Sequence, residues 1–227
     1  MTPPMKAMIL AAGQGTRMRP LTDHTPKPLL PAGGKPLIVW HIEKLAHAGF
    51  RDIIINLAWL GWKIPEALGD GSRWGVHLHY SDEQHSGGLE TAGGIIKALP
   101  LLGGQPFLVI NGDIWCDYPY PPMALAENDL AHLVLVDNPP QHPLGDFGLE
   151  NGRVSSESEP GKARFTFSGI GYYRPELFSG LPQGKLPLGP LLRTAMRKQQ
   201  VSGEWFGGGW RDIGTPERLA ELDQSLI

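Results

Sequence analysis

A glycine-rich loop near the start of the chain carries residue types that bind phosphate. Its sequence, AAGQGTR at 11–17, follows the short, mostly apolar run Lys6–Leu10. Gly13 and Gly15 have no Cβ, so their backbone N–H groups can approach an anion closely. Arg17 offers a planar fork of donors that matches phosphate oxygens. The loop therefore indicates a phosphate site, and a tight turn with an exposed arginine is the alternative.

Two common phosphate loops do not account for this segment. The motif G-x-x-x-x-G-K-[ST] is absent from the sequence, and the dinucleotide pattern G-x-G-x-x-G has Met18 where the third glycine belongs. Lys27 lies between two prolines, which stiffen its backbone. A lysine fixed in this way can hold its ammonium group at a set place for an anion, so Lys27 joins Arg17 as a candidate catalytic residue.

Two aspartates are candidates for metal ligands. Asp113 follows the apolar run FLVI, and Asp212 lies 99 residues later in WRDIGTP (212 − 113 = 99). Mg²⁺ is typically bound by one or two carboxylates together with substrate phosphates. Taken singly, each aspartate could be a turn residue or a charge that flanks a helix. Their occurrence together with Arg17 and Lys27 favours a magnesium site.

Strands and helices that alternate over the first half must position these groups. Unbroken apolar runs predict strands at 6–10, 51–57, 74–83 and 106–113, and apolar spacings of three and four predict helices at 36–50, 62–71 and 89–99. Such strands are typical of parallel sheets that are covered on both faces. We therefore expect an α/β fold with a doubly wound, mostly parallel, Rossmann-like sheet and helices on both faces. Its ligands should bind at the carboxyl ends of the strands.

The second half has a different pattern. It predicts strands at 131–138 and 164–173, a hairpin at 145–154 and helices at 188–200 and 215–226, the last with Thr215 as N-cap and Pro216 at the first helical position. No repeat or linker divides the chain. We expect a single domain, 1–227, in which a small additional β region within about 121–227 closes a pocket against the half formed by about 1–120.

Composition limits the classes of partner. The net charge is −3 with no basic block, which argues against a nucleic-acid surface. The single cysteine, Cys116, excludes an internal disulfide, and no apolar run approaches the ~18 residues of a membrane span. We expect a cytoplasmic protein with small-molecule partners and no nucleic acid or membrane, as a monomer or a small homo-oligomer.

These motifs together resemble a known family. LAAGQGTR at 10–17 and PKPLLP at 26–31 are similar to the signature of the sugar-1-phosphate nucleotidylyltransferases, and GLETAGGI, NGD, FTFSGIGYY and WRDIGTPERL extend the resemblance over essentially the whole chain. The resemblance implies that Asp113 and Asp212 hold one Mg²⁺, that Arg17 stabilises the triphosphate and that Lys27 grips phosphate at the reacting centre. It also implies a nucleotide-binding first half and a sugar-binding second half.

The resemblance further implies how each substrate is bound. The nucleotide is expected to contact Ala11, Ala12, Gly13, Gly15, Thr16, Arg17, Gly88 and Thr91. The sugar phosphate is expected to contact Gly148, Glu150, Lys162 and Gly169. Many relatives carry E-K-P, with a lysine that binds the sugar phosphate, whereas this chain has Glu159 in that position. A carboxylate repels phosphate, so we expect Lys162 or Arg164 to replace that lysine.

The chain is similar within the family to short bacterial uridylyltransferases of peptidoglycan recycling. This implies transfer of UMP from UTP to N-acetylmuramate α-1-phosphate, with one extra cation near the lactyl carboxylate. A sugar phosphate is largely a dianion near pH 7, so its oxygen can attack the α-phosphorus without a general base. Mannose-1-phosphate guanylyl transfer and glucose-1-phosphate thymidylyl or uridylyl transfer are the alternatives. A catalytically inactive nucleotide-sugar sensor is an alternative of another class.

Overall fold

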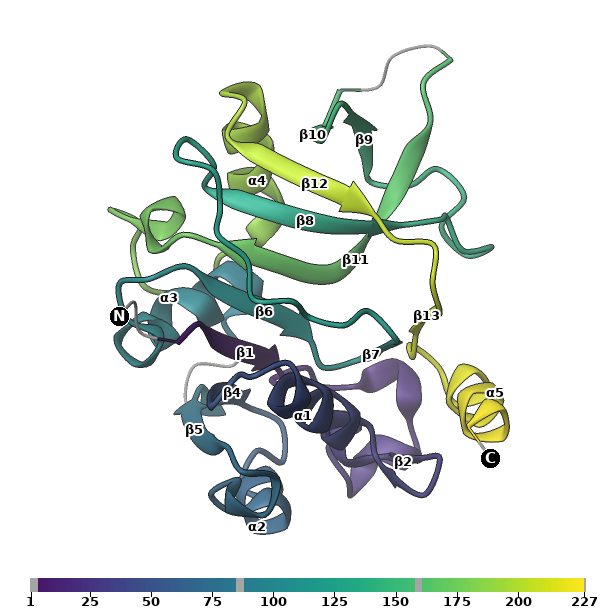
Figure 1. The fold of residues 1–227 in the computed structure, drawn as a ribbon. Helices are drawn as coiled ribbons and strands as arrows, with labels where there is room; N and C mark the ends of the chain where they lie inside the picture. Colours follow the sequence, from purple (N-terminus) through teal and green to yellow (C-terminus); the bar gives the residue numbers. More distant parts are fainter. Residues whose placement is uncertain (1–3, 85–87, 158–160, 227) are drawn as a thin grey trace.

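The protein is described by a computed structural model that covers residues 4–84, 88–157 and 161–226. Within these ranges nine strands form one sheet: β1 (Lys6–Leu10), β4 (Asp52–Leu57), β5 (His77–Asp82), β6 (Phe107–Asn111), β8 (Ala131–Val136), β9 (Phe147–Glu150), β10 (Arg153–Ser155), β11 (Arg164–Tyr173) and β12 (Val201–Trp205). Their order is β5-β4-β1-β6-β11-β8-β12-β10-β9. Figure 1 shows that this sheet runs through both halves of the chain.

The first four strands of the sheet are parallel, as the sequence predicted. β1 pairs in parallel with both β4 and β6, and β4 pairs in parallel with β5. Ile53, Ile54 and Ile55 in β4 are all fully buried. Because successive side chains of a strand point to opposite faces, both faces of this part of the sheet are covered.

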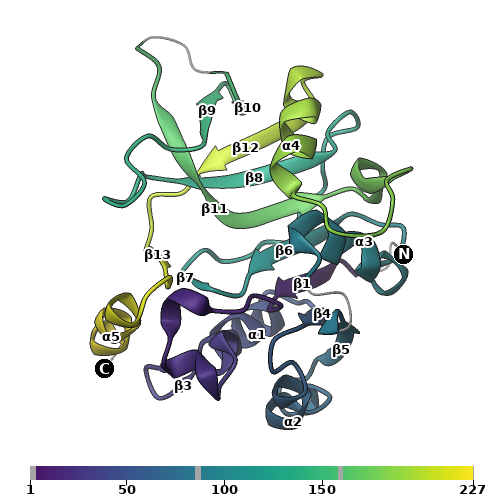
Figure 2. The same ribbon diagram turned by 180° about the vertical axis from the view of Figure 1, so that it is seen from behind.

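Helices lie on both faces of the sheet, which confirms that expectation. α1 (Leu37–His47) packs in the same cluster as Ile53 and Ile55, and α3 (Glu90–Leu102) packs in the cluster that contains Ile54. α2 (Lys63–Leu68) joins the face of α1, and α4 (Leu188–Arg197) joins the face of α3. α1 is therefore in front in Figure 1, and α3 and α4 are in front in Figure 2.

The expectation of a mostly parallel sheet is wrong for the second half. β11 runs antiparallel to both β6 and β8. Parallel neighbours need a long crossover connection, usually helical, and the described residues between β6 and α4 form no α-helix. β8 and β12 are parallel, and α4 lies in the chain between β11 and β12. The sheet as a whole is therefore mixed.

Five strands of the second half close on themselves as a small β region. β9 pairs with β10 in the predicted hairpin and also pairs with the start of β11, where Arg164 is opposite Gly148. The ring runs β11-β8-β12-β10-β9 and returns to β11. The hairpin turns through Asn151 and Gly152, which both have positive φ, as a two-residue turn requires.

Two short ribbons lie outside the main sheet. β2 (Pro31–Ala32) pairs with β3 (Lys35–Pro36), and β7 (Ile114–Cys116) pairs with β13 (Trp210–Asp212). The described 3₁₀ helices are η1 (Thr16–Met18), η2 (Leu21–Asp23), η3 (Lys27–Leu29), η4 (Ser72–Trp74) and η6 (Pro175–Phe178). The sequence did not predict these ribbons or β12 as separate elements.

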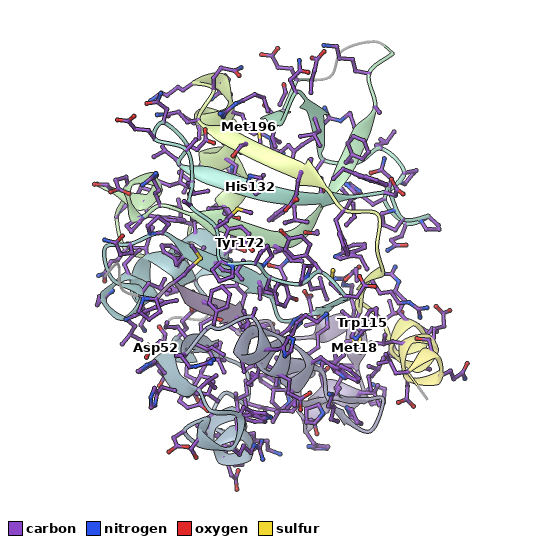
Figure 3. The ribbon with its side chains drawn as sticks, viewed as in Figure 1. Met18, Asp52, Trp115, His132, Tyr172 and Met196 are labelled. Carbon is purple, nitrogen blue, oxygen red and sulfur yellow. The ribbon has the colours of Figure 1, made fainter. Side chains whose placement is uncertain are left out.

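The last helix, α5 (Pro216–Ser225), packs against the N-terminal half. Thr215 caps it, as predicted, with its side chain accepting from the Arg218 N–H. The Gly33 N–H next to β2 donates to Asp223 Oδ1 at 2.7 Å. Met18 and Trp115 pack in the cluster beneath α5, and Figure 3 shows both labels beside that helix. Ile213, which follows β13, is buried in the same cluster.

No helix in the described ranges combines the length and the apolar character that crossing a bilayer demands.

Candidate active site

A cavity of about 390 Å³ opens where the parallel strands end. Leu10 and Asn111, the last residues of β1 and β6, line it together with Asn56 near the end of β4. Seven residues that the sequence singled out line this cavity: Ala11, Ala12, Gly13, Lys27, Gly88, Thr91 and Asp113. A cavity at the carboxyl ends of parallel strands is the usual ligand site of such sheets.

The glycine-rich loop is held in shape from two sides. The Ala11 N–H donates to Asn56 Oδ1 at 2.7 Å, which fixes the turn that leaves β1. Gly15 has a φ of 62°, and a Cβ there would lie 2.8 Å from Thr22 Cγ2. The Thr22 hydroxyl donates to Gly15 O at 2.7 Å. Gly15 and Thr16 are not among the residues that line the cavity, and they shape the turn that leads to Arg17.

Lys27 reaches one of the two aspartates. It begins η3, between Pro26 and Pro28, and its side chain is 8% exposed. Its Nζ donates to Asp113 Oδ2 at 2.9 Å. The Asp113 side chain is 40% exposed, so the carboxylate is paired and still accessible from the cavity.

The β7–β13 ribbon brings the second aspartate to the first. Asp212 is opposite Ile114, and the Ile213 N–H donates to Asp113 O at 2.9 Å. Two residues that are 99 positions apart therefore lie one step apart across this ribbon. Asp212 Oδ2 accepts from Arg218 Nη1 at 2.6 Å, so this carboxylate also has a cationic partner.

Arg17 lies on the Asp212 side of the site. A Cβ added at Gly214 would lie 3.1 Å from Arg17 Nη1, and 3.2 Å from both Arg218 Nη1 and Asp212 Oδ2. The three side chains thus converge over Gly214. Arg17 is exposed and does not line the 390 Å³ cavity.

The donor set fits Mg²⁺ better than a softer metal. Asp113 and Asp212 supply carboxylate oxygens, and Mg²⁺ commonly combines one or two such groups with phosphates and water. Among the residues that the structure describes, no group of three or more His, Cys, Asp or Glu side chains could hold a metal ion by itself. Cys116 is buried in the hydrophobic core, and burial raises the pKa of its thiol to about 11.

A buried pair that the sequence analysis missed supports the cavity wall. Glu83 is 1% exposed, accepts from Asn56 Nδ2 at 2.8 Å and from the Leu89 N–H at 3.3 Å, and lines the cavity. Burial raises the pKa of its carboxyl group. A Cβ at Gly94 would lie 2.7 Å from Glu83 Oε1, so α3 needs glycine there. Asn56 lies near the carboxyl end of a predicted parallel strand, and this position could have identified it as a site residue.

Lys185 also lines the cavity, and a backbone contact with α3 holds it there. The Gly93 N–H donates to Leu186 O at 3.1 Å, and a Cβ at Gly93 would lie 2.1 Å from Gly184 O. Lys185 Nζ lies 3.7 Å from Glu90 Oε1. No local pattern around residue 185 marks it as a site residue, because the contact depends on α3.

Gly169 adjoins the nucleotide side of the site. It lies in β11 where the pairing with β8 shifts between Phe167 and Ile170, and its φ is 82°. A Cβ there would lie 2.6 Å from Asn111 Nδ2, and Asn111 lines the 390 Å³ cavity. The bulge in β11 therefore brings the second half of the chain to the end of β6.

The other predicted sugar-phosphate residues line a second cavity, of about 260 Å³. Gly148, Glu150, Lys162 and Arg164 are among its lining residues. Lys162 Nζ donates to Glu150 Oε2 at 2.7 Å. The Arg164 guanidinium donates to the carbonyl oxygens of Asp146 and, at 3.0 Å, Glu157. Glu159, which takes the position of the E-K-P lysine, lies outside the described residues.

Comparison with known proteins places the chain among enzymes. Residues 6–227 match the family model described as nucleotidyl transferase. The N-acetylmuramate alpha-1-phosphate uridylyltransferase of Neisseria meningitidis serogroup B is 56% identical over 96% of both chains. Mannose-1-phosphate guanyltransferase beta-B of Xenopus laevis is 29% identical over 94% of this chain and 62% of its own length. A Bacillus anthracis crystal structure, described as a glucose-1-phosphate thymidylyltransferase, shares the fold with a TM-score of 0.82 at 24% identity, over 98% of this chain and 95% of that one.

Proposed function

The chain belongs to the nucleotidyl transferase family, and we propose that it transfers UMP from UTP to N-acetylmuramate α-1-phosphate, with release of pyrophosphate. The observation that carries the choice of substrates is the 56% identity with the Neisseria uridylyltransferase along nearly the whole of both chains. The product would be UDP-N-acetylmuramate. The proposed setting is peptidoglycan recycling in the cytoplasm, where UTP is available.

The cavity at the ends of the parallel strands is the proposed UTP site. Ala11 and Ala12 are small, so a planar base can approach the backbone of the turn that Asn56 holds. Gly88 and Thr91 line the same cavity next to the start of α3. Residues from about 1–120 would thus supply most of the nucleotide site, to which Lys185 adds a cation, and residues from about 121–227 would bind the sugar.

Asp113 and Asp212 are the proposed ligands of Mg²⁺, which would supply divalent positive charge beside the phosphates. Lys27 and Arg17 are the proposed catalytic residues. The Lys27 ammonium, fixed on Asp113 at 2.9 Å, can hold a phosphate at the reacting centre, and Arg17 can pair with the triphosphate from the Asp212 side.

The reaction needs no proton transfer from the protein. An oxygen of the sugar phosphate dianion forms a bond to the α-phosphorus of UTP. The bond from that phosphorus to the bridging oxygen breaks, and pyrophosphate leaves with the electron pair. The chain therefore contributes by positioning the two substrates and by stabilising the charge that develops in the transition state. Both effects are strongest when the protein groups are fixed in place before the reaction.

A substrate matrix tests this function. UTP, GTP, CTP and dTTP would each be combined with the 1-phosphates of N-acetylmuramate, N-acetylglucosamine, glucose and mannose, and pyrophosphate release would be measured with Mg²⁺ present. We expect the highest kcat/KM for UTP with N-acetylmuramate 1-phosphate. A preference for GTP with mannose 1-phosphate would refute the substrate assignment. Absence of pyrophosphate in every combination would instead identify a nucleotide-sugar sensor.

Lys162 is the proposed replacement for the lysine of E-K-P. Its ammonium lines the 260 Å³ cavity and is exposed enough to meet a sugar phosphate beside Glu150. Lys162→Ala should raise the KM for the sugar phosphate several-fold, since a charge-assisted contact is lost. Lys198→Ala, just after α4, is the matched surface control. An unchanged KM in the Lys162 variant would remove this residue from the sugar site.

A further inference from the structure

Neither outer edge of the β7–β13 ribbon is paired with another strand in the described part of the chain, and the edge of β7 has other partners. β7 faces β13 through alternate residues: Asp113 O accepts from the Ile213 N–H at 2.9 Å, and the Asp117 N–H donates to Gly209 O at 3.0 Å. The backbone groups of the residues between them alternate in direction. The carbonyl groups of Ile114 and Cys116 therefore point away from β13.

Two side chains of α1 occupy this edge in place of a strand. His41 Nε2 bonds Ile114 O at 2.9 Å, and Lys44 Nζ donates to Cys116 O. His41 and Lys44 are three residues apart, so they lie on one face of the helix. Their spacing matches two carbonyl groups that are two residues apart on the strand. Two side chains of a helix thus bond the outward carbonyl groups of this strand edge.

The histidine can make this contact in one tautomer. A carbonyl oxygen only accepts, so the hydrogen-bond network assigns the ring proton to Nε2. Nδ1 then accepts from the Tyr120 hydroxyl at 2.9 Å. His41 is 2% exposed, and burial lowers its pKa to about 4, so the ring is neutral at pH 7. Both of its nitrogens have partners, and a neutral ring with a fixed tautomer keeps one orientation.

The contact lies next to the proposed metal ligands. Ile114 follows Asp113 in the chain and faces Asp212 across the ribbon. β7 and β13 have three residues each and stand outside the nine-stranded sheet, to which Trp210 Nε1 joins them through a bond to Ser168 O at 2.8 Å. Buried carbonyl groups are almost always paired, and here two of the partners come from α1.

We propose that His41 and Lys44 are positioning residues of the metal site, which set the placement of the Asp113 and Asp212 carboxylates through the carbonyl groups of Ile114 and Cys116. This inference rests on the proposed function, because it assigns to α1 a role in the affinity for magnesium. Groups that orient metal ligands from behind commonly change metal affinity by about 10–100-fold when they are removed.

Binding of an unreactive nucleotide separates this role from general stability. The dissociation constant of α,β-methylene-UTP would be measured by calorimetry with Mg²⁺ and again with EDTA. The ratio of the two constants is the gain that Mg²⁺ provides. His41→Leu, which removes the donor, should reduce this gain about tenfold. His41→Gln, whose amide can donate at the Nε2 position, should restore most of it.

Leu45→Ala is the matched control. Leu45 is fully buried in the same helix and the same cluster, so its truncation weakens the packing of α1 without touching a carbonyl group of β7. We expect it to lower the melting temperature and leave the Mg²⁺ gain unchanged. Thermal melts would be recorded for every variant. If His41→Leu does not fold, Lys44→Met and Tyr120→Phe provide the comparison.

The outcomes are distinct. A Mg²⁺ gain that stays at the wild-type value in the folded His41 and Lys44 variants would overturn the positioning role and leave the proposed function intact. An equal loss of gain in Leu45→Ala would also overturn it, because the effect would then be general destabilisation. A wild-type protein that binds the analogue equally well with Mg²⁺ and with EDTA would refute the proposed metal site itself.

Discussion

Replacing Gly94 by alanine tests whether the buried Asn56–Glu83 pair holds the nucleotide cavity in shape. Gly94 lies inside α3, where alanine would ordinarily stabilise the helix by about 1 kcal/mol relative to glycine. The new Cβ would lie 2.7 Å from Glu83 Oε1 and 3.0 Å from Asn56 Nδ2. These distances are too short for a carbon atom against buried polar atoms, so the pair has to move.

The cost follows from the hydrogen bonds that the pair makes. Glu83 bonds Asn56 at 2.8 Å, and Asn56 in turn accepts from the Ala11 N–H at 2.7 Å. A hydrogen bond to a charged group contributes about 1.5–3 kcal/mol and a neutral one about 1 kcal/mol. Losing one of each costs about 3 kcal/mol, and the helix gain offsets about 1 kcal/mol. Gly94→Ala should therefore destabilise the protein by about 2 kcal/mol.

The nucleotide site should weaken in the same variant. Ala11 lines the cavity, and Glu83 also holds the Leu89 N–H beside Gly88. Displacing the pair should raise the KM for UTP several-fold. Urea unfolding would give the change in stability, and pyrophosphate release would give the KM.

Gly189→Ala in α4 is the matched control. Its Cβ would meet Arg193 Nη1 at 3.1 Å, which is the end of an exposed and movable side chain. That variant should be neutral or slightly stabilised. If Gly94→Ala were as stable as Gly189→Ala and kept the wild-type KM, the Asn56–Glu83 pair would not support the cavity.

Three further predictions concern charged or titratable groups. Lys27→Met should lower kcat by about 100-fold or more, because a preorganised cation beside the reacting phosphate is lost, and rapid-quench assays would show it. Lys185→Ala should raise the KM for UTP about fivefold with kcat nearly unchanged, as steady-state assays would measure, if this cavity-lining cation contributes to uniform binding. The pKa of His41 is lowered from 6.5 to about 4 in the folded state, so between these values the unfolded chain binds the extra proton and stability falls as the pH falls. Wild type should thus lose about 3 kcal/mol relative to His41→Gln between pH 7 and pH 4, in urea unfolding at each pH.

The sequence predicted those structural features that depend on short stretches of the chain. Ala11–Gly13, Lys27 and Asp113 line one cavity at the end of the sheet because parallel strands send their carboxyl ends to the same edge, whereas Arg17 lies outside that cavity. Thr215 and Pro216 marked the start of α5 because an N-cap and a proline at the first helical position act within a few residues. These features depend on neighbours in the chain.

Strand direction and long-range pairing could not be predicted in the same way. The apolar pattern of β11 is the same whether it runs parallel or antiparallel to β6, since both have a period of two. β7 and β13 have three residues each, and Cys116 pairs with Trp210 across 94 positions (210 − 116 = 94). Segments this short carry too little pattern to indicate a partner.

Two glycines held a signal that the sequence analysis did not use. Gly93 and Gly94 are adjacent inside an amphipathic helix, where each costs about 1 kcal/mol relative to alanine. A pair of such residues suggests that something approaches the helix closely. The structure shows both approaches: Gly184 O lies over Gly93, and Glu83 lies over Gly94. The glycine pair thus indicates that other parts of the chain pack closely on α3, and these parts contain Glu83 and Lys185, which the sequence analysis missed.

The charges around the two aspartates explain why their placement matters. Lys27, Arg17 and Arg218 supply three positive charges against the two carboxylates, a net of +1 (3 − 2 = 1). A phosphate monoester alone carries up to about two negative charges at pH 7, and the triphosphate adds more. These side chains therefore cannot neutralise both substrates. A further lysine beside them would compete with a metal ion for the carboxylates of Asp113 or Asp212. A divalent ion held by the proposed ligands would add two charges at one point, and the pairing of β7 with β13 sets where Asp212 stands relative to Asp113.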